Sequence, residues 1–430
     1  MLKSPVRRFL PKLTRTERAW ILYDVGNSAY TLAVTTAVFP IFFKTIVAAD
    51  IDDQVSTGML GTANTIAALA VALLAPILGS MADFSGNKKR LFAAFFAFGV
   101  LATLLLATVE PGTETRVLFV FVLSAVGFAG SNVFYDAFLP DVTTPDRMHA
   151  VSTAGFAWGY IGSTIPFVVA MALIVVAQNS DTIATVPATR LAFVLTGVWW
   201  VLFTIPMLRR VRQTHSLTAE HNAFLDGFRR LVRTFREVRR YRNLAIFLAA
   251  YFLYIDGVGT IIKMATAFGT DIGISSDRLL VVLLAVQIVA FPFALAYGYL
   301  AKLTSAKRML SIGILVYVVV TLGAFLIPRL PDGAQIGAFW GVSMLLATSQ
   351  GGIQALSRSM YAQMIPADSA AEFFGFYNIF GKFAAILGPF LLGQVAVATG
   401  DTSIGALSLI VLFAGGFLLL QRVEEPGARK

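Results

Sequence analysis

Apolar runs of membrane-spanning length occupy most of this 430-residue sequence. A helix needs about 20 apolar residues to cross the hydrocarbon core of a bilayer, and twelve runs approach or exceed that length. They do not alternate polar and apolar residues, as the strands of a membrane barrel would. The sequence therefore predicts an all-α integral membrane protein with twelve transmembrane helices, at residues 20–46, 57–79, 91–109, 117–139, 151–177, 190–208, 243–268, 279–300, 309–327, 335–357, 373–398 and 403–421.

Composition excludes a water-soluble protein. Hydrophobic residues make up 57% of the chain and charged residues 13%, with a mean hydropathy of +0.75. Soluble domains carry about a quarter charged residues, so this chain has too little polar surface to cover itself in water. The net charge of +10 would suggest a nucleic-acid partner in a soluble chain. Here the charge lies in the connections between spans, and we expect no nucleic acid.

The basic residues concentrate in alternate connections. Cytosolic loops of membrane proteins carry an excess of lysine and arginine, so these connections are predicted to be cytosolic. Both termini then lie in the cytosol of a multi-pass plasma (inner) membrane protein, surrounded by membrane lipids. The cytosolic set includes Lys3, Arg7, Arg8, Lys12, Arg15, Arg18, Lys88, Lys89, Arg90, Lys302, Lys307 and Arg308. The opposite connections carry Asp50, Asp52, Asp53, Glu110, Glu114, Asp181 and Asp401.

One short polar loop occurs twice. Residues 79–90 (GSMADFSGNKKR) follow the second span, and residues 298–308 (GYLAKLTSAKR) follow the eighth. A chain that repeats a loop after about half its length is predicted to consist of two related halves, as many secondary transporters do. We therefore expect a six-helix half at 1–208, a linker at 209–242 and a second six-helix half at 243–430.

The linker is rich in arginine, and its apolar residues recur at helical spacing. This pattern predicts a basic amphipathic helix at the cytosolic membrane face. Such a helix would either sense anionic lipids and regulate the protein or act as a topology signal and connector. Two further spacings, Gly155-x-x-x-Gly159 and Gly337-x-x-x-Gly341, predict close helix packing.

The first loop resembles the signature of the major facilitator superfamily between its second and third spans, G-x-x-x-D-x-x-G-x-[KR]-[KR]. Gly79, Asp83, Gly86, Lys88 and Lys89 match this signature, whereas Phe84 and Asn87 stand where basic residues are usual. The resemblance implies a cytosolic latch that joins the halves and steadies the outward-facing state. Asp83 could pair with basic residues or cap a helix N-terminus.

Longer stretches resemble one branch of that superfamily, the fungal autophagy-related vacuolar effluxers and their bacterial relatives. They are residues 20–30 (WILYDVGNSAY), 152–162 (STAGFAWGYIG), 254–260 (YIDGVGT), 354–359 (QALSRS) and 372–377 (EFFGFY). Fungal members are described as amino-acid exporters. The resemblance implies a monomeric secondary active transporter that exports a small solute, an amino acid being favoured, by proton-coupled alternating access.

Ionisable residues inside the predicted spans are candidate machinery, because each costs roughly 2.5–3.5 kcal/mol to insert and so usually faces a partner or a cavity. Asp256 and Lys382 fall near the middle of spans seven and eleven. We hypothesise that Asp256 binds the coupling proton with Lys382 as its counter-charge. The alternative is a static ion pair that holds two helices together.

A second group of charges falls in the cytosolic halves of spans one, four and ten: Asp24, Asp136 and Arg358. Arg358 could bind a substrate carboxylate, or it could pair with Asp136 or Asp24 as an inner gate. Uncharged polar residues could hydrogen-bond the substrate or join helices. They include Asn27, Trp158, Gln354 and Asn378.

Other functions are less compatible with the sequence. A primary pump would need a nucleotide-binding loop of the form G-x-x-x-x-G-K-[ST], which does not occur. An intramembrane transferase would need clustered carboxylates, and Asp141 and Asp146 are the nearest approach. No cysteine is present, and no cofactor or metal is expected. A facilitator of lipids or other amphipathic molecules remains the main alternative.

Overall fold

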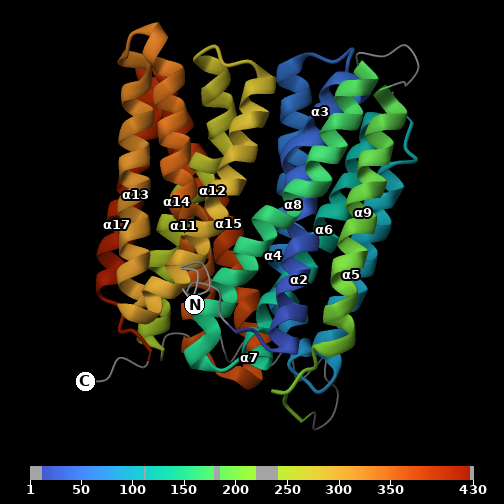
Figure 1. Cartoon of the computed structure of the whole chain (residues 1–430), viewed down its shortest axis with the longest axis vertical. Coiled ribbons are helices and arrows are strands. Elements are labelled where there is room, and N and C mark those ends of the chain that lie inside the picture. The colour runs from blue at the N-terminus through green and yellow to red at the C-terminus, as the bar shows by residue number, and fades with distance from the viewer. Residues whose placement is uncertain (1–11, 111–112, 179–184, 219–240, 427–430) are drawn as a thin grey trace, which may run out of the picture.

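The structure is a computed structural model that describes residues 12–110, 113–178, 185–218 and 241–426, without the side chains of a few helical residues such as 382–386. Helices form two bundles that stand side by side, one coloured blue to green and the other yellow to red in Figure 1. The predicted amphipathic linker helix falls on residues 219–240, outside the described residues.

The first bundle contains the first six spans. The first span is divided into α2, η1, α3 and η2, where η1 and η2 are π-helical. Short segments α7 and η3 connect the fourth and fifth spans. The bounds are α2 Arg15–Tyr30, η1 Thr31–Ala37, α3 Val38–Phe42, η2 Phe43–Val47, α4 Asp53–Ala82, α5 Asn87–Leu106, α6 Glu114–Ala137, α7 Leu139–Val142, η3 Pro145–Arg147, α8 Met148–Gln178 and α9 Thr185–Arg210.

The second bundle contains the last six spans, and its final span is divided into α16 and α17. The bounds are α11 Arg242–Asp271, α12 Ser276–Leu303, α13 Ala306–Leu326, η4 Ile327–Arg329, α14 Asp332–Met364, η5 Ala367–Ser369, α15 Ala370–Thr399, α16 Thr402–Leu407 and α17 Ile410–Gln421.

The helices agree with the predicted spans. Among the described residues, ten helical segments are long and apolar enough to cross a membrane. The other two predicted spans correspond to α14, which carries more polar residues such as Arg358, and to α15, where the side chains of residues 382–386 lie outside the described part of the chain. Together with the similarity to solved structures reported below, this confirms the all-α membrane fold.

Contacts between the bundles use helices from both halves of the chain. Helix α4 packs against α15, and α8 packs against α12 and α14. At the α4–α15 crossing a Cβ on Gly79 would collide with the backbone of Ala371, and one on Gly375 with the backbone of Ala75. Only glycine lets two helix backbones approach this closely. The end of the molecule that carries α7, at the bottom of Figure 1, is called the α7 end below.

The two predicted glycine spacings have different outcomes. Cβ atoms on Gly155 and Gly159 would meet Asp24 and Ser28 of α2, so this pair does permit close packing of α8 on α2. The prediction for Gly337 and Gly341 was wrong, because a Cβ on either would meet nothing within 4 Å. Their side of α14 is open.

Candidate functional site

Arg358 of α14 is the centre of a buried charged cluster at the α7 end. Its Nη1 donates to Asp136 Oδ1 of α6 at 3.0 Å, and its Nη2 lies 3.5 Å from Asp24 Oδ2 of α2. Its Nε and Nη2 also bond the hydroxyl and carbonyl oxygens of Ser152 on α8, at 2.9 and 3.1 Å. One residue of the second half therefore binds three helices of the first.

Aromatic rings enclose this guanidinium. Its Cζ lies 4.7 Å from the Trp20 ring centroid and 4.6 Å from that of Phe156. Tyr135 donates its hydroxyl to Asp24 Oδ2 at 2.6 Å and stacks on Trp20. With four of its five N–H groups bonded and both faces covered, Arg358 has a side chain only 5% exposed. In this conformation it has no free donor edge for a substrate carboxylate, which favours the gate among the two hypotheses.

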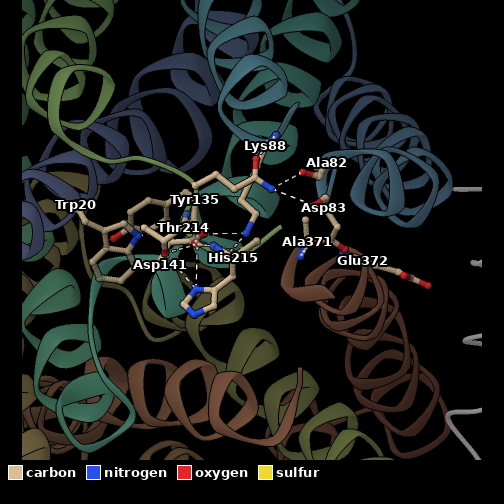
Figure 2. A network of polar contacts seen from close by, with 12 residues as sticks. Trp20, Ala82, Asp83, Lys88, Tyr135, Asp141, Thr214, His215, Ala371 and Glu372 are labelled. Carbon is tan, nitrogen blue, oxygen red and sulfur yellow. Dashed lines mark hydrogen bonds and ion pairs between the residues drawn. The ribbon is translucent and has the colours of Figure 1, made fainter. Parts of the chain in front are cut away.

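Asp83 forms a second connection between the halves. Its Oδ1 and Oδ2 accept the backbone N–H groups of Ala371 and Glu372, at 2.8 and 2.9 Å. These residues begin α15, whose N-terminus carries unpaired N–H groups and partial positive charge. Asp83 is fully buried, and Figure 2 shows its side chain directed at the start of α15. The structure thus has the helix-capping geometry that was one of the two expectations for Asp83.

The rest of the first loop binds within its own half. Gly86 has a φ of 79°, a left-handed conformation that favours glycine, and it precedes α5. Lys88 and Asp141 form a fully buried salt bridge of 2.9 Å. Asp141 Oδ1 also accepts the backbone N–H groups of Thr214 and His215, each at 2.8 Å. Figure 2 shows Asp141 between the lysine and this start of the linker.

Similar hydrogen bonds, called braces below, hold both copies of the loop. In the first, Lys89 Nζ donates to Val211 O at 2.9 Å, and Gln213 accepts the backbone N–H of Lys88 at 3.3 Å. In the second, Lys307 Nζ donates to the carbonyls of Gln421 and Val423 at 2.7 and 2.9 Å. Glu425 there accepts the N–H of Ala306 at 2.6 Å. The segment after the sixth span and the segment after the twelfth thus dock on equivalent helix N-termini.

Asp256 of α11 faces α15 with 0% exposure. Its Oδ2 accepts the N–H of Gly388 at 2.7 Å, and its Oδ1 has no hydrogen-bond partner among the described residues. A Cβ on Gly388 would collide with Thr260 and lie 3.0 Å from Asp256 Oδ1. Lys382 belongs to α15, but its side chain lies outside the described residues. The expected pair with Asp256 therefore stays a prediction.

The predicted substrate-binding residues are dispersed. Asn27 accepts a 3.3 Å bond from Asn132, close to the Arg358 cluster. Gln354 and Asn378 donate to carbonyls of their own helices, at 3.1 and 3.0 Å. Trp158 is 40% exposed and packs on Phe291 of α12, 5.4 Å between ring centroids. Because it lies two residues from Phe156, it points to another face of α8, and the structure does not bring it to the cluster.

Several residues of the site were not predicted from the sequence. Ser152, Tyr135 and Trp20 hold Arg358 and Asp24, while Gln213 and Thr214 hold the first loop. Ser152 and Trp20 fall in the family-like stretches but carry no charge to mark them. The linker residues have no local signal, since their role depends on where the sixth span ends.

Comparisons with known proteins identify relatives of the chain. A family model described as "Vacuole effluxer Atg22 like" matches residues 51–430. "Uncharacterized MFS-type transporter YxiO" of Bacillus subtilis (strain 168) is 46% identical over 418 residues, which cover 97% of this chain and 96% of that protein. "Autophagy-related protein 22" of Yarrowia lipolytica is 27% identical over 65% of this chain, which spans about half (51%) of the fungal protein.

Solved structures share the fold. The proton:xylose symporter XylE superposes with a TM-score of 0.69 at 11% identity, covering 96% of this chain and 95% of that one. The transporter FucP in its outward conformation gives a TM-score of 0.66 at 14% identity, covering 97% and 100%. At these identities the likeness concerns the fold alone.

Proposed function

Because the chain belongs to the family of vacuole effluxer Atg22-like proteins within the major facilitator superfamily, we propose that it exports a small solute by proton-coupled alternating access. The family and fold are those of membrane transporters and not of enzymes. An amino acid is the favoured solute, because the sequence resembles fungal effluxers described as amino-acid exporters.

The observation that carries this proposal is the junction of the halves at the α7 end. Arg358 joins the second half to Asp24 and Asp136 of the first, and Asp83 joins the first half to α15. These are polar contacts between pre-formed helices, and each can break without unfolding a helix. Alternating access requires such a reversible closure at one end of the bundle.

The α7 end is the cytosolic end in this proposal. It carries Lys88, Lys89 and Arg90 of the first loop and Lys302 and Lys307 of the second. Lysine and arginine are enriched on the cytosolic side of membrane proteins. The contacts at Arg358 and Asp83 then close the cytosolic side, so the conformation is outward-facing, and the termini lie in the cytosol of the plasma (inner) membrane.

Asp256 is the proposed proton site. A carboxylate with no exposure inside a membrane helix needs a partner or a proton, and among the described residues only one of its oxygens is hydrogen-bonded. Protonation removes the charge and alters the bond to Gly388, which belongs to a helix at the interface of the halves. A static helix–helix bond is the competing role for the same geometry.

Proteoliposomes with an imposed pH gradient and a panel of labelled amino acids test the proposal. We expect at least one amino acid to move with the gradient, and Asp256→Asn to abolish proton-driven movement while the protein stays folded. Asp401→Asn, an exposed acid on the opposite end, is the matched control. Absence of movement for every amino acid would remove the substrate class, and coupling retained in Asp256→Asn would remove the proton site.

One observation favours the amphipathic-substrate alternative. An apolar cavity of about 90 Å³ lies inside the second half, lined by α11, α13, α14, α15 and α16 and including Phe268, Phe339 and Leu346. It does not include the charged cluster at the α7 end. Fluorescent phospholipid movement across the same proteoliposomes, blocked by Phe339→Trp to fill the cavity, would support this alternative over the transport of small solutes.

A further inference from the structure

The charges around Arg358 do not balance. In the part of the chain that the structure describes, its single guanidinium contacts two carboxylates, Asp24 and Asp136. Asp24 is enclosed, because its Oδ2 also accepts the Tyr135 hydroxyl and its side chain is 8% exposed. Asp136 is the more open of the two at 16%. Its Oδ1 binds Arg358, and its Oδ2 has no hydrogen-bond partner among the described residues.

The surroundings of that free oxygen suit a cation. On the first half, Asn132 lies one helical turn before Asp136 on α6 and donates its amide N–H to Asn27 Oδ1 at 3.3 Å. On the second half, the rings of Tyr251 and Tyr377 stack with centroids 4.3 Å apart, and Tyr377 packs on Tyr361, one helical turn beyond Arg358 on α14, with centroids 4.8 Å apart. A carboxylate with neighbouring aromatic rings is a combination that recognises ammonium groups.

We infer that Asp136 is the recognition site for an ammonium group of the substrate, with Tyr251 and Tyr377 as its aromatic wall. This inference rests on the proposed transport function and specifies the substrate class as a small molecule with a protonated amine. A carboxylate on the substrate is not required, since four of the five N–H groups of Arg358 are already bonded.

The same geometry links recognition to the gate. An ammonium group at Asp136 competes with Arg358 for the same carboxylate. Binding therefore weakens the contact between the halves at the α7 end, while Asp24 and Ser152 still hold Arg358 in place. A substrate without an amine leaves the bond between Arg358 and Asp136 intact.

Three probes with one carbon skeleton test the inference on purified protein: leucine, 3-methylbutylamine, which lacks the carboxylate, and 4-methylpentanoate, which lacks the amine. Calorimetric titration should show the amine binding at least as tightly as leucine, and the acid at least about tenfold more weakly, as expected for the loss of one bond to a charged group. Equal binding of amine and acid, or failure of the amine to bind, overturns it.

Variants locate the site. Asp136→Asn should weaken amine binding at least about tenfold, Asp136→Glu should restore the preference for amine over acid, and Asp401→Asn should leave binding unchanged. Unchanged amine binding in Asp136→Asn overturns the assignment. If Asp136→Asn does not fold, Tyr251→Leu replaces it, and the amine must then lose affinity relative to the acid for the inference to stand.

The outcome is separable from that of the proposed function. Leucine that is transported although the amine does not bind overturns the ammonium site and leaves the transporter proposal intact. An amine that binds through Asp136, while no amino acid crosses the membrane, supports the site and removes amino acids as the substrate class.

Discussion

Asp83→Asn should open the α7 end of the molecule without unfolding it. The carboxylate caps α15 through two bonds of 2.8 and 2.9 Å to the N–H groups of Ala371 and Glu372. Asparagine has almost the same shape but keeps one acceptor oxygen and no charge. The amide nitrogen would face a backbone donor, so one bond is lost and the other is weakened.

The size of the effect follows from the chemistry of these bonds. A hydrogen bond to a charged group contributes about 1.5–3 kcal/mol, and a partly buried charge at a helix terminus contributes up to about 2 kcal/mol. Because asparagine retains part of the hydrogen-bond energy, we expect the closed form to lose about 2 kcal/mol of stability relative to the open form. This changes the equilibrium between the two forms about 30-fold. A form open at the α7 end and populated at about 1% would rise to about a quarter.

Spin labels can measure this shift because the natural chain contains no cysteine. Ser85 and Lys302 are exposed at the α7 end, one on each half, so the pair Ser85→Cys and Lys302→Cys reports their separation. Asp83→Asn should add a longer distance to the distribution. Asp146→Asn is the matched control, since Asp146 is exposed at the same end and, in the described part of the chain, accepts a hydrogen bond from Thr144 of its own half.

An unchanged distribution in Asp83→Asn, with the protein folded, would refute the cap as a latch. A shift of the same size in Asp146→Asn would show that loss of any acid at this end opens the molecule, and would refute the reasoning equally.

Three further predictions concern other contacts. Gly388→Ala places a Cβ against Thr260 and Asp256, so it should lower the melting temperature and impair proton-driven transport. A Cβ on Gly393 of the same helix meets nothing within 4 Å, so Gly393→Ala should have neither effect. Equal effects of the two variants would contradict the packing argument. Asp141→Asn leaves Lys88 buried without its counter-ion and should lower the free energy of unfolding by about 3–5 kcal/mol. A melting temperature equal to that of the parent protein would contradict this prediction. The ammonium group in Arg358→Lys cannot reproduce the four hydrogen bonds of the guanidinium, so this variant should reduce transport. Arg329→Lys at the opposite end of the molecule should not reduce it. Full activity in Arg358→Lys would exclude the gate.

The sequence predicted the spans because a bilayer imposes one length and one polarity on every helix. It did not predict the irregularities within spans, such as the π-helical turns at Thr31–Ala37 and Phe43–Val47 or the division between α16 and α17. Those depend on how side chains of other helices fit, which leaves no periodic signal in the chain.

The candidate site was predictable in its charges but not in its contacts. The cost of burial identifies Asp24, Asp136 and Arg358 from the sequence alone. The structure adds that Arg358 binds both carboxylates at once and that aromatic rings cover its guanidinium. It also assigns Lys88 to Asp141 within one half, whereas the expectation joined it to a latch between the halves.

The paired braces behind the two loops have a consequence for how the chain could be assembled. In each half, the segment that follows the last span binds that half's own loop. Val211 and Gln213 bind the first loop, and Val423 and Glu425 bind the second. Among the described residues, these hydrogen bonds stay within their own half, as expected for two independent folding units. Two separately synthesised pieces, divided between residues 219 and 240, should therefore associate in the membrane into a functional protein. A tag fused directly after Gln421 should impair the folding of the second piece alone.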